Sequence, residues 1–187
     1  MYPLIALLTD FGTQDWFTAE MKAVIHGIAP QSTVLDISHA VQPGDIRSAA
    51  FILNACYKSF PAKSIFCISV DATEDICPAI IVHCDDHFFI ASDNGILSWI
   101  TNGKQFQVWH IKNKVFFHSS KPTTFRGRDV LGPVAAHLSR GITPERFGCS
   151  ATTIQTINIP TPVFISSNVV EGEIIYIDHF GNAITTI

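Results

Sequence analysis

Acidic side chains recur where the predicted strands end, and groups of this kind bind ligands or move protons. Asp10 closes an apolar run over 4–8, and Asp71 closes another over 64–70. The full set is Asp10, Asp36, Asp71 and the neighbouring pair Asp93 and Asn94. One aspartate at a strand end is common as a turn former, but several at one sheet edge indicate a site. They would suit a divalent metal, the vicinal hydroxyls of a ribose, or a cationic ligand.

The loop over 123–129 also carries chemistry, because hydroxyls, an aromatic ring and two arginines directly precede a predicted helix. One interpretation is a helix cap with surface ion pairs, in which Asp129 or a neighbour caps the helix. The other is a ligand-binding loop, with Phe125 packed on a ring and the backbone N–H groups of the helix start facing the ligand. The residues alone leave both open.

Several familiar sites are excluded. Asp10-Phe11-Gly12 lacks the Gly-rich loop, strand lysine and catalytic loop that accompany this tripeptide in kinases. The chain has no Walker lysine loop and no Gly-x-Gly-x-x-Gly. Cys77, His83, Cys84 and His87 lack zinc-finger spacing, and the adjacent His83 and Cys84 would point to opposite faces of a strand.

The elements that position these residues alternate along the chain. Apolar runs predict strands over 4–8, 33–37, 64–70, 79–83, 87–91, 105–111, 172–178 and 183–187, and apolar spacing predicts helices over 15–29, 46–57, 96–100 and 128–139. We expect Asp15 and Asp45 to cap the first two helices. Strand–helix alternation predicts an α/β fold with a mostly parallel sheet.

A change in composition after residue 150 predicts the domain organisation. Residues 1–150 form an N-terminal α/β domain, the uncharged and Thr-, Ile- and Pro-rich range 151–168 an extended linker, and 169–187 the beginning of a truncated C-terminal β domain. Hydrophobic residues make up 47% of the 187 and charged residues 15%, as in folded proteins. The net charge of −4 argues against nucleic-acid binding, and apolar runs are too short to cross a membrane. Five cysteines without Cys-x-x-Cys spacing suggest reduced thiols in a cytoplasm.

Motifs across nearly the whole chain together resemble one family, the S-adenosylmethionine hydroxide adenosyltransferases, relatives of the bacterial fluorinase and chlorinase. The motifs are Thr9-Asp10-Phe11-Gly12 with Asp15, Asp36-Ile37-Ser38-His39, Val70-Asp71, Asp93-Asn94-Gly95, Thr124-Phe125 with Gly127-Arg128-Asp129, Pro133 to Leu138, and Tyr176-Ile177-Asp178 with Phe180-Gly181-Asn182. The resemblance implies an N-terminal α/β domain followed by a small C-terminal β-barrel domain. It also implies a homotrimer that binds S-adenosylmethionine between the N-terminal domain of one subunit and the C-terminal domain of the next, with no cofactor and no metal.

The resemblance also implies roles for individual residues. Asp10 matches the carboxylate that holds the ribose hydroxyls, and Asp71 matches the first member of an Asp-Arg-His set that orients and activates water. Further ligand contacts are expected from Asp15, Asn94, Thr124 and Phe125, and from Asp178, Phe180 and Asn182 on the methionine and adenine side. Thr73 resembles a hydroxyl residue that helps to hold halide in halogenase members. The loop from Asp71 to Cys77 carries no Arg or Lys, and Arg126 occupies the histidine position. We therefore expect Asp71 and Arg126 to be catalytic, with Arg126 as a fixed positive charge and not a base.

The implied reaction is attack of a water-derived nucleophile on C5′ of the ribose, which releases adenosine and methionine. An anionic nucleophile and a sulfonium leaving group cancel charge in the transition state, so positioning in a dry pocket favours the reaction. Three alternatives remain: a binding or sensing module that keeps the ligand site without catalysis, a halide-using member, and a metal-dependent phosphoesterase built on the strand-end aspartates.

Overall fold

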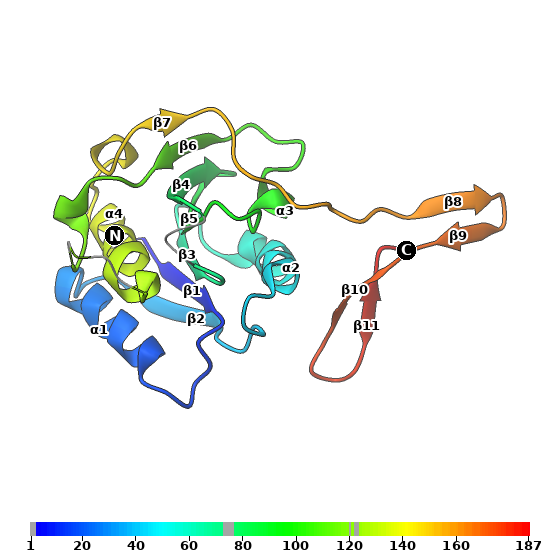
Figure 1. Ribbon diagram of the computed structural model, residues 1–187, viewed down its shortest axis with the longest axis horizontal. Helices are drawn as coiled ribbons and strands as arrows, with labels where there is room; N and C mark the ends of the chain where they lie inside the picture. The colour runs from blue at the N-terminus through cyan, green and yellow to red at the C-terminus, as the bar shows by residue number, and fades with distance from the viewer. Residues whose placement is uncertain (1–2, 73–76, 120, 122–123) are drawn as a thin grey trace.

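The computed structural model describes residues 3–72, 77–119, 121 and 124–187. Its centre is a seven-stranded sheet with the strand order β2-β1-β3-β5-β4-β6-β7 (Figure 1). The strands are β1 (Ile5–Thr9), β2 (Val34–Ser38), β3 (Ile65–Ser69), β4 (Ala79–Cys84), β5 (His87–Ser92), β6 (Gln107–His110) and β7 (Ser150–Ala151). β1 pairs in parallel with β2 and β3, and β3 with β5, whereas β4 pairs antiparallel with β5 and β6, and β6 with β7. The predicted α/β class is confirmed.

Helices cover both faces of this sheet (Figure 1). The α-helices are α1 (Phe17–Ile28), α2 (Ile46–Cys56), α3 (Ser98–Thr101) and α4 (Gly132–Ser139). α1 and α4 pack against each other on one face, and α2 and α3 lie together on the other. The short helical segments are η1 (Tyr57–Ser59), η2 (Lys114–Phe116), the π-helix η3 (Gly127–Leu131) and η4 (Pro144–Arg146). Because both faces are covered, all five residues of β1 are buried, which explains its unbroken apolar sequence.

The capping predictions have different outcomes. Asp45 caps α2, since its Oδ1 accepts a hydrogen bond from the Ser48 N–H at 3.0 Å. The prediction for Asp15 is wrong, because Trp16 takes the N-cap position of α1 and makes no side-chain cap. The prediction for Asp129 is also wrong. Helical turns already begin at Gly127, so Asp129 lies inside the π-helix, where it is buried and paired with Arg128.

After β7 the chain leaves the sheet and forms two separate hairpins (Figure 1). Their strands are β8 (Val163–Ser166), β9 (Val169–Glu171), β10 (Ile174–Ile177) and β11 (Ala183–Thr185). β8 thus lies within the range expected to be linker. The described residues show hairpins where the resemblance implied the start of a barrel. β10 contacts α2, where the rings of Phe51 and Tyr176 stack with centroids 5.1 Å apart and Arg47 pairs with Glu173 at 2.8 Å.

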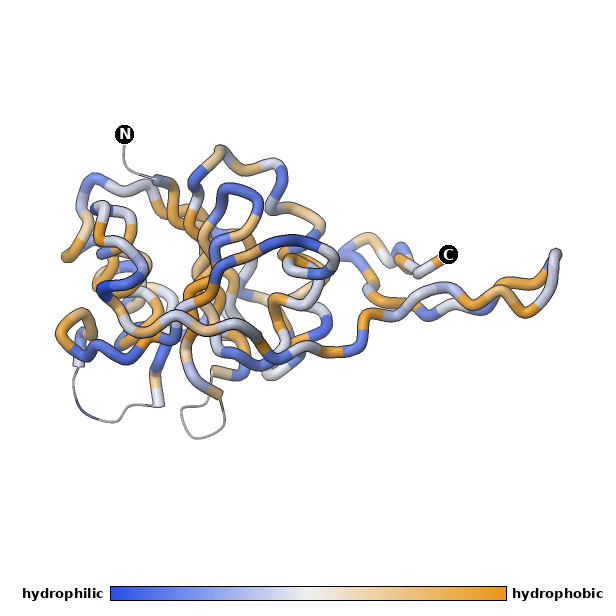
Figure 2. Tube along the Cα trace, turned by 90° about the horizontal axis from the view of Figure 1, so that it is seen from above, coloured by the Kyte–Doolittle hydropathy of each residue, from blue (hydrophilic) through white to orange (hydrophobic). Residues whose placement is uncertain are grey.

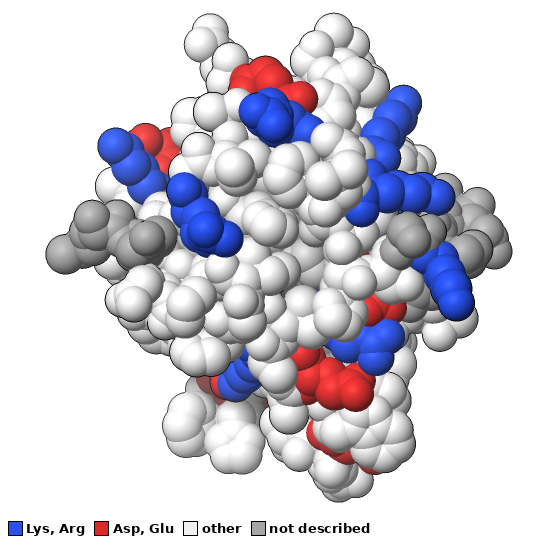
Figure 3. Space-filling model, turned by 90° about the vertical axis from the view of Figure 1, so that its left-hand side faces the viewer, with Lys and Arg blue, Asp and Glu red and all other residues white. Residues whose placement is uncertain are grey.

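Hydropathy follows this arrangement. Hydrophobic residues gather along the central strands and the inner sides of the helices, and they also run along the projecting β8–β9 hairpin (Figure 2). On the face that Figure 3 presents, the described Lys and Arg side chains are separated by uncharged and acidic ones and form no continuous stripe. Among the described helices, none combines the length and apolar character needed to cross a membrane.

Candidate active site

The parallel strands β1, β3 and β5 end at the same edge of the sheet, and three predicted site residues meet there. Asp10 follows β1, Asp71 follows β3, and Asn94 lies just beyond β5. Asp10 Oδ2 accepts hydrogen bonds from the Asp71 N–H at 3.3 Å and from the Gly44 N–H at 3.0 Å. Asn94 Nδ2 donates to the carbonyl of Val70 at 3.1 Å and to that of Asp71 at 3.5 Å. The predicted convergence of strand-end residues is therefore present.

Asp71 occupies an unusual backbone conformation at this edge. Its φ of 47° lies in the left-handed region, which few residues other than Gly, Asn and Asp adopt. Its N–H is bonded to the carboxylate of Asp10, and its carbonyl accepts from Asn94. Asp71 is an exposed residue, and its backbone is bonded on both its N–H and its carbonyl.

Phe125 lies in an aromatic cluster over the end of β1. Its ring makes edge contacts with Phe11 at a centroid distance of 5.3 Å and with Phe17 at 5.4 Å. The guanidinium carbon of Arg128 lies 4.9 Å from the centroid of the same ring. Gly127 is needed beside this cluster, because a Cβ there would lie 2.7 Å from Phe11 Cζ and 2.9 Å from Ser69 Oγ. The 124–129 loop is thus packed directly on the Asp10-Phe11 turn.

Arg126 is only 5% exposed and lies at the same edge. Its Nη1 donates to the carbonyl of Cys77, at the start of the segment that leads into β4, at 2.9 Å. Burial raises the pKa of the Cys77 thiol, the charges of Asp93 and Asp71 raise it further, and the charge of Arg126 lowers it. These three charged groups are therefore close enough to act on one thiol, and Arg126 brings positive charge into a site rich in carboxylates.

The neighbouring Arg128 has a structural role. Its Nε and Nη2 bind the two carboxylate oxygens of Asp129 at 2.7 and 2.8 Å, and its Nη1 donates to Glu20 in α1 at 3.1 Å. Asp129 is 1% exposed, so this bidentate pair fixes the π-helix against α1. The ion-pair interpretation of the loop is confirmed for Arg128, although Asp129 is buried and the pair is not on the surface.

Comparison with known proteins decides the family. Residues 5–148 match the family model described as the SAM hydroxide adenosyltransferase N-terminal domain. The chain belongs to this family. It is 30% identical to an (R)-S-adenosyl-L-methionine hydrolase of Thermus thermophilus, with 98% of this chain and 74% of that protein covered. It is 24% identical to a fluorinase of Actinoplanes sp., with 99% and 72% covered. The crystal structure of an uncharacterized conserved protein from Thermotoga maritima superimposes with a TM-score of 0.92 at 34% identity, over 98% of this chain and 71% of that one.

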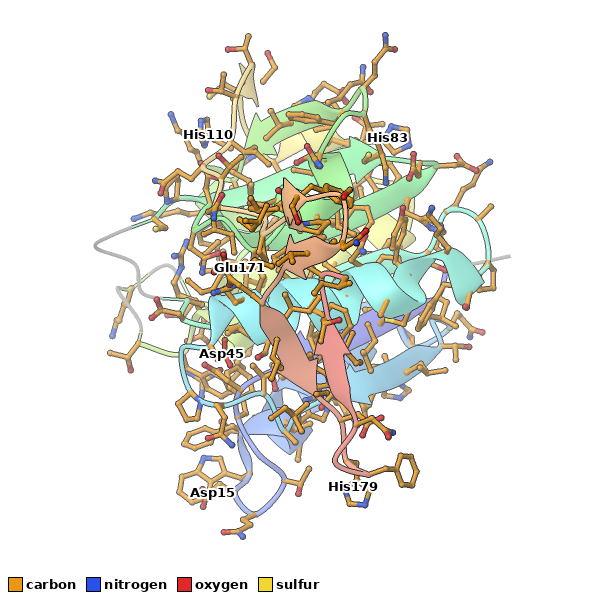
Figure 4. All side chains as sticks on the ribbon, turned by 90° about the vertical axis from the view of Figure 1, so that its right-hand side faces the viewer. Asp15, Asp45, His83, His110, Glu171 and His179 are labelled. Atoms are coloured by element: carbon orange, nitrogen blue, oxygen red, sulfur yellow. The ribbon has the colours of Figure 1, made fainter. Side chains whose placement is uncertain are left out.

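Within this family fold, the other predicted site residues differ in their exposure and surroundings. Asp15 is exposed and projects from the molecule, apart from Asp45 at the start of α2 (Figure 4). The turn between β10 and β11, which carries His179, is also separate from Asp45 in that view. Thr124 is exposed beside Phe125, and Thr73 lies outside the described residues.

The three C-terminal residues assigned by resemblance to the family form one tight turn. Asp178 Oδ1 accepts from the N–H groups of Phe180 and Asn182 at 2.9 and 2.8 Å, and its Oδ2 accepts from Asn182 Nδ2 at 2.7 Å. These bonds, the Asn182 side chain first, lower the pKa of Asp178. Phe180 is 87% exposed at the tip of the turn, where its ring projects into solvent.

Asp36, also singled out at a strand end, serves the fold. Lys22 Nζ lies 2.6 Å from its Oδ2, and His39 Nε2 lies 3.0 Å from its Oδ1. Burial favours the protonated carboxyl, but the hydrogen bonds from Lys22 and His39 outweigh it, so the pKa of Asp36 is lowered. His39 also bonds Thr9 Oγ1 at 2.8 Å through Nδ1, which ties β2 to the end of β1.

Sequence reasoning missed two contributors to the site. The Gly44 N–H binds Asp10 across 34 residues, and the only signal, Pro43-Gly44-Asp45, predicted just a helix start. The sequence predicts Gly127 only as part of a loop, because its close approach to Phe11 and Ser69 depends on the tertiary fold. As for a metal, no three His, Cys, Asp or Glu residues of the described ranges are grouped to hold an ion.

Proposed function

We propose that this protein cleaves S-adenosylmethionine by substitution at C5′ of the ribose, with water or hydroxide as nucleophile. The observation that carries the proposal is the joining of Asp10 and Asp71 at the carboxyl edge of adjacent parallel strands, in a chain of this family. The hydrolase name of the Thermus thermophilus relative supports the same chemistry. A bond forms between the water oxygen and C5′ while the C5′–sulfur bond breaks, and the products are adenosine, methionine and a proton.

In this proposal Asp10 holds the ribose. Its Oδ2 is bound by two backbone N–H groups, and among the described residues no hydrogen bond reaches Oδ1. An acceptor fixed in this way suits a ribose hydroxyl. Asp71 orients the attacking water, and Arg126 supplies fixed positive charge that favours a hydroxide-like nucleophile. Arg126 cannot remove the proton, because a guanidinium stays charged in proteins.

We further propose that the active form is a homotrimer and that the C-terminal strands belong to a small barrel domain. The Asp178–Asn182 turn supports this, because Asp178 bonds within the turn itself and the turn exposes the ring of Phe180. A turn of a neighbouring subunit would bring Asp178, Phe180 and Asn182 to the methionine and adenine side of the ligand. We expect no metal and no cofactor to take part.

A second function, a binding or sensing module without catalysis, is favoured by one observation. Arg126 occupies a site where a base would help, and its Nη1 is already bonded to the Cys77 carbonyl. A third, a halide-using enzyme, has support from the fluorinase relatives. The sensing module would form no product, and the halide-using enzyme would form a halogenated nucleoside in place of adenosine.

The test is incubation of the protein with S-adenosylmethionine, with and without chloride, followed by chromatography. Equal amounts of adenosine and methionine would support hydrolysis, and a 5′-chlorinated nucleoside would support the halide alternative. Binding by calorimetry without any product would refute the enzyme proposal in favour of the sensing module. Asp71→Ala should abolish turnover and leave affinity largely unchanged, and a fully active variant would refute the role of Asp71. Ligand binding and turnover that do not change when EDTA or a divalent metal is added would rule out the metal-dependent phosphoesterase alternative.

A further inference from the structure

The loop after β5 makes an unusual set of bonds around the proposed catalytic residue. Asn94 Nδ2 reaches two consecutive carbonyls, those of Val70 and Asp71, at 3.1 and 3.5 Å. Its Oδ1 accepts the N–H of Ile96 at 3.2 Å. Both ends of this amide are therefore engaged within the protein. Resemblance to the family predicts Asn94 as a ligand contact, whereas these bonds direct its side chain to the backbone of Asp71.

The bonds of Asn94 act where the backbone needs support. Asp71 is a non-glycine residue with a φ of 47°, a conformation that costs free energy and is stabilised by hydrogen bonds from its surroundings. The Asn94 side-chain amide donates to the carbonyls on both sides of the Asp71 Cα, and the Asp10 carboxylate accepts from the Asp71 N–H. Three bonds from two strand ends thus fix the direction in which the Asp71 carboxylate leaves the chain.

The loop that carries Asn94 is itself anchored on two sides. The Asp93 N–H donates to the Pro78 carbonyl at 2.8 Å, next to the start of β4. On the other side, the segment after β7 docks on the loop. The Gln155 N–H donates to Asp93 Oδ1 at 2.7 Å, and the Ile157 N–H donates to Ser98 Oγ at 2.9 Å. Asp93 is 8% and Ser98 2% exposed, so these anchors are buried.

We propose that Asn94 is a positioning residue for Asp71 and acts on the reaction only through it. The loop over 92–98 is fixed by its bonds to Pro78 and to the segment that carries Gln155 and Ile157. This loop orients the Asn94 side-chain amide, and the amide orients the backbone of Asp71. The inference rests on the proposed function where it concerns the reaction, and on the hydrogen bonds alone where it concerns the conformation of Asp71.

Asn94→Asp is the sharpest variant, because it keeps the size of the side chain and the acceptor for Ile96 but removes both donated bonds. Asn94→Ala removes them without adding charge. The matched control is Asn113→Asp. Asn113 makes the same kind of bridge, with Nδ2 donating to the Arg146 carbonyl at 3.0 Å and Oδ1 accepting the Val115 N–H at 3.2 Å, outside the site.

We expect both Asn94 variants to lower kcat roughly tenfold or more while KM stays within about threefold of wild type, and Asn113→Asp to change neither. A rise in KM at unchanged kcat would instead identify Asn94 as a ligand contact and overturn the proposal. Unchanged kcat and KM in both Asn94 variants would overturn it too.

Amide hydrogen exchange tests the conformation independently of turnover. The N–H groups of Asp71 and Gly44 both bind Asp10 Oδ2, but only Asp71 is bonded to Asn94. In Asn94→Asp, exchange at Asp71 should rise roughly tenfold, while Gly44 and the buried Ile68 keep wild-type rates. If the wild type proves inactive, the proposed function fails, but hydrogen exchange still decides whether Asn94 positions Asp71. Unchanged exchange at Asp71 would refute the positioning role, and a rise at all three amides would show general unfolding and count against it as well.

Discussion

The Oδ2 oxygen of Asp10 accepts the backbone N–H of Asp71 at 3.3 Å, which joins the ends of β1 and β3. The residue proposed to hold the ribose therefore also supports the residue proposed to orient water. Two functions of Asp10 can be separated by substitution, since Asn keeps an oxygen acceptor for the Asp71 and Gly44 N–H groups and Ala does not.

Asp10→Asn should weaken binding of S-adenosylmethionine by roughly ten- to a hundredfold, because the ribose hydroxyls lose a charged acceptor. Asp10→Ala should weaken it at least as much and also lower kcat, because the Asp71 N–H loses its partner. Calorimetry and steady-state kinetics measure the two effects. Wild-type affinity in both variants would contradict the ribose assignment.

Arg126→Gln should reduce turnover strongly, since it removes a positive charge from the site whose carboxylates, those of Asp71 and Asp93, act with Arg126 on the pKa of Cys77. It should also lower the free energy of unfolding by about 1.5–3 kcal/mol, the usual contribution of a hydrogen bond from a charged donor, here to the Cys77 carbonyl. The control is Arg140→Gln, in which an exposed guanidinium loses its bond to the Ile28 carbonyl at 3.2 Å. That variant should keep full activity. Full activity in Arg126→Gln as well would show that its charge has no part in the reaction.

The α/β core could be predicted because its signals are local. The apolar run before Asp10 is long enough to be a strand buried on both faces. Asp45 caps α2 by accepting a hydrogen bond from the N–H of Ser48, three residues away. The site's bonds are not local, since Asp10 meets Asp71 and Gly44 only after β1 and β3 are paired. The residue types at the strand ends therefore predict which carboxylates form the site, but they do not predict which backbone N–H groups bind those carboxylates.

The same limit explains the errors around the helices. Asp129 has the residue type and position of a cap, but it is buried and bonds Arg128, which also bonds Glu20 of α1, 108 residues away. Arg126 is predicted at the site from its place in a motif, and no periodicity indicates that its side chain is buried against Cys77. Tertiary packing decides both cases.

Gly127→Ala should destabilise the protein by about 1–3 kcal/mol, because the new Cβ would lie 2.7 Å from Phe11 Cζ and 2.9 Å from Ser69 Oγ in a packed region. Phe11 follows Asp10 directly, so its displacement should also weaken ligand binding. Gly27→Ala is the matched control, since a Cβ there meets nothing within 4 Å. In the α1 helix it should stabilise by up to about 1 kcal/mol. Urea denaturation compares the two, and equal stability of both variants would rule out the predicted clash.

The stability of the protein should fall on acidification from pH 7 to pH 5, and His87 should account for part of the loss. Its ring is buried against Phe66, with centroids 5.5 Å apart, and against Tyr57 at 6.1 Å. Burial lowers the pKa of His87 from its ordinary 6.5, although the nearby Asp86 and Asp85 oppose the shift. The unfolded chain therefore binds this proton more readily than the folded one, so the contribution is present above pH 6.5 and is lost as pH falls through the lowered pKa.

His87→Phe keeps an aromatic ring in the cluster and removes the proton site. The dependence of the unfolding free energy on pH should become flatter by up to about 1.4 kcal/mol per pH unit, the value for one proton. His137, whose pKa is lowered by burial and by Arg140, should leave a residual slope. Urea denaturation at pH 5, 6 and 7 measures the slope, and His26→Gln, at an exposed position of α1, serves as the control. A slope equal to that of the wild type in His87→Phe would show that His87 takes up no proton on unfolding.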